Sequence, residues 1–141
     1  MFTSDTERSR RLLLRTARSD FLAALVCAVF GAVYEHFSFG VYSPYMLFAF
    51  AVPLLLGALP ALLLATGAQA AAVPAITRKL WHAGVASLTV GALFRGILDI
   101  YGTASALTRI YWVAGAVLLM AAAAAWPALR LHAQKNTVRN R

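Results

Sequence analysis

Four long apolar segments, separated by short polar or turn-forming stretches, dominate the pattern of hydrophobic and polar positions along the chain. They cover approximately residues 20–39, 44–66, 79–101 and 107–129. Each is long enough for an α-helix to cross roughly 30 Å of hydrocarbon, which takes about 20 mostly apolar residues. The pattern therefore predicts an all-α polytopic membrane protein, with a bundle of four transmembrane helices over residues 20–130.

Two basic segments flank this predicted membrane domain, at residues 1–19 and 131–141. The first mixes three leucines with five arginines. That composition suits either a basic helix lying on anionic inner-leaflet lipid or a disordered tail that only orients the protein. Both flanking segments are expected to be cytoplasmic.

Turn-forming residues lie at the expected ends of the helices. Ser43-Pro44 suits the start of the second helix, Thr77 can cap the third, and Gly102 suits the end of the third. The outer connections are short. The first and second helices, and likewise the third and fourth, are therefore expected to form antiparallel hairpins.

The second segment carries a stripe of Pro53, Gly57 and Pro60. Residues of these types can kink a transmembrane helix and free backbone carbonyls, and broken helices build the binding sites of transporters. Prolines are also common in membrane helices that simply pack. We favour packing as the role of this stripe.

Composition excludes a water-soluble fold. Of the 141 residues, 61% are hydrophobic and 13% are charged, and the mean hydropathy is +0.71. Soluble domains carry roughly 25% charged residues, and so little polar surface cannot cover the core of one. The net charge of +8 does not indicate nucleic-acid binding, because no basic stripe with interleaved aromatic residues occurs outside the chain ends.

The distribution of basic residues predicts the orientation of the bundle. Eleven of the 13 lysines and arginines lie in three clusters, before the first helix, between the second and third, and after the fourth. All three clusters are on one side of a four-span chain, and the positive-inside rule makes that side cytoplasmic. The two opposite turns carry an interfacial belt of aromatic residues: Phe37, Phe39, Tyr42, Tyr45, Tyr101, Tyr111 and Trp112.

Small and polar residues form stripes at helical spacing on the first and third helices. Such stripes are expected to be packing faces, because small residues let backbones approach closely in lipid. We expect these two helices to face each other, directly or across the bundle axis. The stripe of the first helix holds Asp20, Ala24, Cys27, Gly31, Glu35 and Ser38, and that of the third holds Gly84, Ser87, Gly91, Arg95, Asp99 and Gly102.

An acid and a base are expected to meet on these stripes. Glu35 lies about 22 Å beyond Asp20, and Arg95 lies about 21 Å beyond Trp81, at 1.5 Å per residue. The two charges are thus at nearly equal depth in the outer leaflet, and Asp99, one turn above Arg95, can bind the same guanidinium. Ionisable groups inside a span normally find a partner, so an ion-pair cluster is predicted.

The role of this cluster stays open between two interpretations. It locks the bundle as a structural ion pair, or it binds a substrate or a proton. His36, Tyr101 and Arg109 lie near the same outer boundary and complete the candidate ligand or ion-pair cluster. For His36, a plain interfacial position is favoured over a role as ligand or proton relay.

Several kinds of chemistry are not indicated by the residues. Cys27 is the single cysteine, which excludes a disulfide or CxxC redox site within one chain. His36 and His82 are expected at opposite leaflets, so they cannot hold one haem between them. No metal-ligand spacing or catalytic grouping is present, and we predict no cofactor, no metal and no catalytic residue.

Three stretches resemble small four-span bacterial membrane proteins of uncharacterised function. They are Gly31-Ala-Val-Tyr-Glu-His-Phe-Ser, Val41-Tyr-Ser-Pro-Tyr-Met and Asp99-Ile-Tyr-Gly-Thr. The resemblance covers most of the chain and implies a multi-pass protein of a bacterial inner (cytoplasmic) membrane. It implies no defined activity and transfers no functional residues.

Three functions fit these features. We favour a non-enzymatic integral membrane protein, either a subunit of a membrane complex or a binder of a small ligand. One alternative is a proton- or ion-coupled transporter of small molecules that works as an oligomer, with Glu35 as the titrating group. Another is a membrane enzyme for a lipid or quinone, with His36 as acid or base and Arg95 or Arg109 holding an anionic headgroup. Expected partners are membrane lipids, a second copy of the chain or a membrane-complex subunit, and no nucleic acid.

Overall fold

The computed structural model describes residues 2–67 and 73–139, and all regular structure within them is helical. The prediction of an all-α fold is thus confirmed, and α1, α4 and α5 of the described chain are each long and apolar enough to cross a membrane. In chain order the elements are α1 (Phe2–Phe37), α2 (Pro44–Leu47), the π-helix η1 (Pro53–Ala58), α3 (Leu59–Thr66), α4 (Ala75–Ile100) and α5 (Leu107–Arg139).

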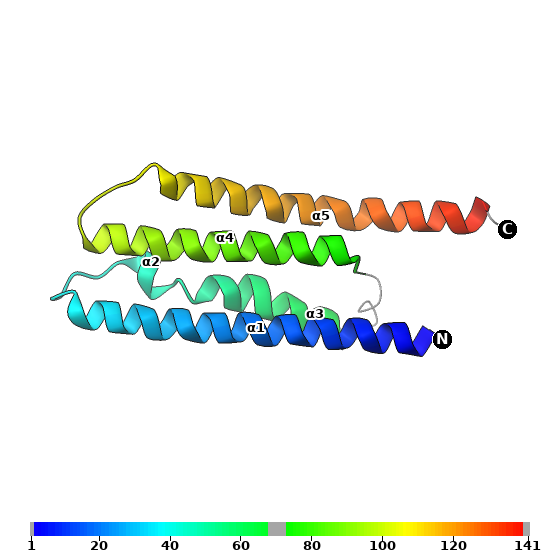
Figure 1. Ribbon diagram of the computed structural model, residues 1–141, viewed down its shortest axis with the longest axis horizontal. Helices are drawn as coiled ribbons and strands as arrows, with labels where there is room; N and C mark the ends of the chain where they lie inside the picture. Colours follow the sequence, from blue (N-terminus) through cyan, green and yellow to red (C-terminus); the bar gives the residue numbers. More distant parts are fainter. Residues whose placement is uncertain (1, 68–72, 140–141) are drawn as a thin grey trace.

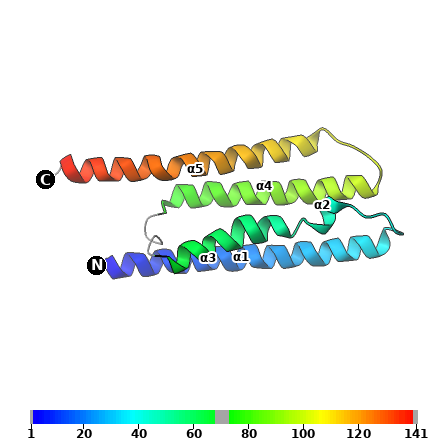
Figure 2. The ribbon, with the colours of Figure 1, turned by 180° about the vertical axis from the view of Figure 1, so that it is seen from behind.

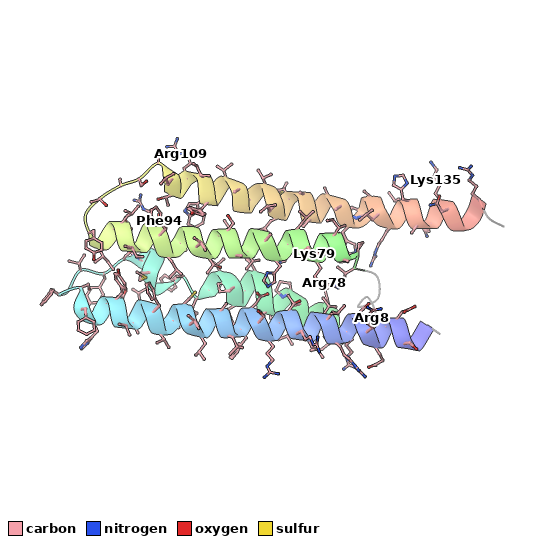
Figure 3. All side chains as sticks on the ribbon, viewed as in Figure 1. Arg8, Arg78, Lys79, Phe94, Arg109 and Lys135 are labelled. Atoms are coloured by element: carbon pink, nitrogen blue, oxygen red, sulfur yellow. The ribbon has the colours of Figure 1, made fainter. Side chains whose placement is uncertain are left out.

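The chain runs along the length of the molecule four times (Figure 1, Figure 2). α1 and α4 run in one direction, whereas the segment from α2 to α3 and helix α5 run in the other. The N-terminus, the start of α4 and the C-terminus lie toward one end, which we call the basic end because Figure 3 shows there Arg8, Arg78, Lys79 and Lys135. The opposite end, with the turns at residues 38–43 and 101–106, we call the aromatic end.

α1 is one continuous helix of 36 residues that joins the described part of the basic segment to the first apolar segment. At 1.5 Å per residue it is about 54 Å long, well beyond the roughly 30 Å of a bilayer core. The basic segment is therefore a direct extension of the first helix, in place of a separate surface helix or a disordered tail. Buried positions recur along α1 at spacings of four and three, on one helix face: Leu13, Ala17, Asp20, Ala24, Cys27 and Gly31.

The second apolar segment departs from the single helix expected over residues 44–66. α2 lasts four residues and is followed by three residues in a turn, after which helical structure resumes and continues through η1 and α3. The apolar stretch Pro53–Thr66 is shorter than a full membrane span. The second segment is thus a broken pass, with α2 toward the aromatic end and α3 toward the basic end (Figure 1).

Proline explains this break. Pro53 and Pro60 have no N–H to donate to a carbonyl one turn earlier, and in a regular α-helix the proline ring clashes with that carbonyl. η1 makes a wider turn, in which the N–H of Leu59 donates to the carbonyl of Leu54, five residues earlier. The stripe therefore interrupts the helix and also packs, since Pro53 and Gly57 are buried.

α5 packs along α4 through the glycine stripe of α4. A Cβ placed on Gly84 would lie 2.9 Å from Cγ of Leu119, and one placed on Gly91 would lie 2.9 Å from Cβ of Tyr111. Between the two glycines, Ser87 Oγ donates to the carbonyl of Tyr111 at 3.0 Å. This part of the stripe faces α5, so it does not meet the stripe of the first helix. The short turn before α5 holds the two helices side by side, and the glycines let their backbones approach.

The broken pass holds α1 and α4 apart at the aromatic end. Met46 of α2 is 1% exposed and fits between Gly31 of α1 and Gly96 of α4. A Cβ on Gly31 would lie 3.0 Å from the carbonyl oxygen of Met46, and a Cβ on Gly96 would lie 2.9 Å from its backbone nitrogen. The stripe of α1 packs mainly on η1 and α3. The two helices therefore face each other across an inserted segment.

Candidate functional site

Arg95 and Asp99 form an ion pair near the aromatic end of α4, with Nε 3.0 Å from Oδ1. The residues are four apart, the spacing that brings two side chains together on one helix face. The buried Ser43 Oγ donates to the second carboxylate oxygen, Asp99 Oδ2, at 3.2 Å. The guanidinium of Arg95 also lies over the ring of Tyr45, 5.6 Å from its centroid. These contacts fasten the start of α2 to α4.

Glu35 is not a third member of that ion pair. No ion pair joins it to Arg95, although both residues lie in the described part of the chain. Glu35 Oε1 is buried there without a hydrogen-bond partner. The prediction that Glu35 contacts Arg95 is therefore wrong. The reason is the inserted α2, whose Met46 separates the two helices and whose Tyr45 lies under the guanidinium.

The other three candidates of the outer cluster do not join the ion pair either. His36 is exposed, and its ring meets the edge of Phe37 with the centroids 5.3 Å apart. Tyr101 is exposed and lies near Tyr34 of α1. Arg109 is exposed and lies at the outer edge of α5 in Figure 3. The candidate cluster is thus divided into one ion pair and separate groups.

A second polar pair lies nearer the basic end and joins α1 to α4. Nε2 of His82 is 3.0 Å from Oδ1 of Asp20. The side chain of Asp20 is 6% exposed and that of His82 is 43% exposed. Gly57 makes room for the carboxylate, because a Cβ at that position would lie 2.6 Å from Asp20 Oδ2. Asp20 therefore rests on the backbone of η1, and a carboxylate buried in this way needs a partner such as His82.

Trp81, next to His82, bonds to the broken pass. Its indole Nε1 donates to the carbonyl of Leu56 at 2.6 Å. In a regular α-helix that carbonyl would accept from residue 60, but Pro60 has no N–H. The indole thus supplies a donor from α4 to a backbone carbonyl of η1, and backbone groups in lipid need such partners. One turn of α4 therefore holds α1 through His82 and η1 through Trp81.

A cavity of about 260 Å³ lies beside this pair. The volume is slightly below the roughly 300–1,000 Å³ of typical small-molecule sites. All four passes contribute residues to its wall, and most of the lining surface is apolar. The apolar part of the wall includes Leu13, Gly57, Ala61, Leu64, Ala122 and Ala123.

Three side chains of the cavity wall carry donors that the described protein leaves without an acceptor. Thr77, expected to cap the third helix, lies inside α4, is 5% exposed, and has no partner for its Oγ1. The buried indole Nε1 of Trp126 also has none. The guanidinium of Arg78 makes no ion pair or hydrogen bond with the described residues. A buried donor without an acceptor costs about 1–3 kcal/mol. The donor atoms of Thr77 and Trp126 are covered by protein, and the surface of the cavity is almost entirely apolar.

Sequence reasoning missed this site for identifiable reasons. The sequence pattern places Asp20 on a packing stripe and His82 near the start of a helix, and it predicts no contact between them. Residue counting places Asp20 and Trp81 at the same depth, and His82 follows Trp81 directly. An acid and a base at equal depth could therefore have indicated a contact between Asp20 and His82. Trp126 gave no such signal, because its place in the wall depends on how α5 packs.

The geometry of the site favours binding. In the described ranges, no group of three or more His, Cys, Asp or Glu side chains could hold a metal ion. Asp20 and His82 are paired with each other. The wall is almost entirely apolar, which suits a small molecule with an apolar part. No protein-family model, curated protein or solved structure matches this chain.

Proposed function

We propose that this chain is a small, non-enzymatic integral membrane protein that binds a small amphiphilic ligand in the cavity at its basic end. The observation that carries the proposal is the apolar cavity that all four passes line, with the paired side chains of Asp20 and His82 at its wall. An apolar pocket with a few convergent polar groups is the usual form of a small-molecule site.

The proposed topology is a four-pass bundle with both ends and the connection between α3 and α4 in the cytoplasm. Four passes are supported by the course of the chain in Figure 1, and the backbone of the broken pass is packed against α1 and α4. The orientation is supported by the basic end, since lysines and arginines favour the cytoplasmic side. The resemblance to small bacterial proteins extends the proposal to a bacterial inner (cytoplasmic) membrane.

In this topology the cavity belongs to the inner leaflet. About 20 residues cross the hydrocarbon core. Counting about 20 residues along α1, α4 and α5 from the aromatic end reaches approximately Asp20, Trp81 and Trp126. Indole side chains are enriched at this boundary between lipid and water. A ligand bound there would have its polar head near the headgroups and its apolar part in hydrocarbon.

The Arg95–Asp99 pair is proposed to be structural. Both oxygens of the Asp99 carboxylate are engaged, by Arg95 and by Ser43, and the guanidinium is stacked on Tyr45. The proposed role of the pair is to hold the broken second pass against α4.

A proton-coupled transporter is a second candidate because of Glu35. Its buried Oε1 has no hydrogen-bond partner among the described residues, and an ionisable group without a partner inside an apolar segment is a candidate for a role in transport. Under that alternative, Glu35→Gln would abolish proton-driven uptake into vesicles while ligand binding at the basic end is kept.

Membrane lipids are the proposed partners of the exposed apolar side chains, which are abundant on α1 and α5. A second copy of the chain or a subunit of a membrane complex is a further proposed partner. The cavity itself needs neither, because one chain supplies the wall.

Native mass spectrometry after purification in mild detergent tests the proposed function. The protein is expected to retain about one small molecule per chain. The same spectrum gives the number of chains in the complex. Ala123→Leu fills the cavity from α5 and is expected to lose the molecule. Ala124→Leu adds the same side chain at an exposed position outside the wall and is the matched control. Retention in both variants would contradict the cavity as the binding site.

A further inference from the structure

We infer that the ligand of this cavity is an uncharged molecule with one short hydrocarbon chain, which fills the space between α5 and helices α1 and α3. The inference rests on the proposed binding function and names the chemical class of the ligand. It is carried by the packing of α5, by the apolar surface of the cavity and by the bonds that engage the polar groups around it.

The cavity lies where α5 is separated from the first and second passes. Among the described helices, α5 packs extensively on α4 alone. Ala122, Ala123 and Trp126 of α5 nevertheless belong to the cavity wall. Leu13 of α1 and Ala61 of α3 belong to the same wall. The cavity thus occupies the space between α5 and these two helices, and a molecule bound there would complete the packing of α5.

One edge of the cavity lies at the surface of α5. Ala123 belongs to the wall and is also exposed. It lies about 24 Å along the helix from Leu107, at 1.5 Å per residue. In the proposed topology this position is within the hydrocarbon core, which is roughly 30 Å thick. A ligand would therefore enter from lipid, which favours a molecule that dissolves in hydrocarbon.

Polar side chains around the cavity are bonded within the protein. Asp20 and His82 are paired with each other. The hydroxyl of Thr16 donates to the carbonyl of Leu12 in its own helix at 3.1 Å. The indole of Trp81 donates to the broken pass. These bonds use the polar groups inside the bundle, and the surface of the cavity is almost entirely apolar.

The remaining polar residues of the wall do not offer a site for a charge. The donor atoms of Thr77 and Trp126 are covered by protein. Arg78 lies at the basic end (Figure 3), and a long arginine side chain can line an apolar surface with its methylene groups while its guanidinium reaches water. A charged head of either sign would be held against apolar surface without a partner, which is costly. The cavity therefore favours an uncharged molecule.

The size of the cavity suits one short chain. A volume of about 260 Å³ is small for a ligand site, which favours a single chain over a lipid with two acyl chains. Water is a poor occupant, because a bound water needs polar partners. Side chains that border an empty space lack dispersion contacts on that side. A hydrocarbon chain supplies those contacts and gains closer packing than it has in fluid lipid.

Tryptophan fluorescence tests this inference, because two of the three tryptophans, Trp81 and Trp126, line the cavity. The third, Trp112, lies near the aromatic end of α5 and is removed by Trp112→Phe. This full-length variant in phosphatidylcholine nanodiscs is titrated with decanol, decanoate and decyltrimethylammonium, each carrying a bromine at the end of its chain. Bromine quenches a tryptophan that it contacts. The pH is set to keep decanoate ionised.

We expect the brominated decanol to quench with saturation, and excess unbrominated decanol to reverse the quenching. Its Kd should be at least about tenfold lower than that of either charged probe. Ala123→Leu in the same background is expected to abolish the saturable quenching, and Ala124→Leu is expected to keep it. Decanol should also raise the Tm of the unmodified chain, since a ligand that binds the folded state stabilises it.

The outcomes separate this inference from the proposed function. Saturable binding of a charged probe as tight as that of decanol, lost in Ala123→Leu, would overturn the uncharged ligand and leave the cavity as a binding site. Quenching that never saturates with any probe, and that decanol does not reverse, would show probe dissolved in lipid and would overturn both. If Ala123→Leu does not fold, the probe series and its reversal by decanol in Trp112→Phe decide.

Discussion

His82 on α4 pairs with Asp20 on α1 at 3.0 Å, and this bond joins two helices that the broken second pass otherwise holds apart. The neighbouring Trp81 donates to Leu56 in the broken pass itself. Two adjacent residues of α4 thus fasten three passes at the level of the cavity. The stability of the bundle and the shape of the cavity are expected to depend on them together.

The Asp20–His82 pair is expected to be energetically coupled. Asp20→Asn and His82→Gln should each lower the free energy of unfolding by about 1–3 kcal/mol, less than for a fully buried pair because His82 is partly exposed. The double variant should lose less than the sum, since neither group is left without its partner. Unfolding by SDS in mixed micelles gives these free energies. Strictly additive losses would show that the pair does not hold the helices together.

The bond from Trp81 is expected to depend on Pro60. Trp81→Phe leaves the carbonyl of Leu56 without its donor and should cost about 1–3 kcal/mol. In a Pro60→Ala background the N–H of residue 60 becomes available to that carbonyl, so the same substitution should cost less. Thermal unfolding in detergent of the four proteins measures the difference. An equal cost in both backgrounds would mean that Trp81 stabilises the bundle only by packing.

The sequence predicts much of the fold but not the course of the second pass. Long apolar segments and short turns are properties of local sequence, so the helical fold and the hairpins could be anticipated. Pro53 and Pro60 indicated a break, but whether a proline kinks a helix or ends it depends on what replaces the lost bonds. Here Trp81, from a distant part of the chain, donates to the Leu56 carbonyl of η1.

The two polar pairs show why depth alone does not identify contacts. Residue counting sets Glu35 and Arg95 at similar depths, yet α2 lies between their helices. Asp20 and His82 are also at similar depths, and there Gly57 lets the carboxylate reach across. Residue counting gives the level of a side chain along the bundle axis. The direction in which it points around that axis depends on packing of the whole chain.

Coupling at the aromatic end is expected between Arg95 and Asp99, and not between Arg95 and Glu35. Arg95→Gln and Asp99→Asn should show an interaction energy of about 0.5–2 kcal/mol in a double-mutant cycle, because they share an ion pair. Glu35→Gln should add to Arg95→Gln within about 0.5 kcal/mol. Detergent unfolding of the single and double variants measures both cycles. Coupling of Glu35 with Arg95 as large as that of Asp99 would contradict the observed pairing.

The proposed orientation predicts which turns are reached from outside. Single cysteines at Tyr42 and Thr103, in a Cys27→Ala background, should react with an impermeant maleimide added to intact cells. A cysteine at Arg8 should react only after the membrane is opened, since it lies at the basic end. Gln69, in the connection expected to be cytoplasmic, lies outside the described residues and provides a further position for labelling. Labelling of Arg8→Cys in intact cells would reverse the orientation and move the cavity to the outer leaflet.

The most direct test of the cavity as a ligand site is photo-crosslinking with a decanol that carries a diazirine on its chain. We predict adducts on peptides that contain the cavity wall, namely residues 57–64 and 122–126, competed away by excess decanol and lost in Ala123→Leu. Peptide mass spectrometry locates them. Adducts confined to lipid-facing residues such as Val117 and Met120, and unchanged by the competitor, would contradict a specific site at the basic end.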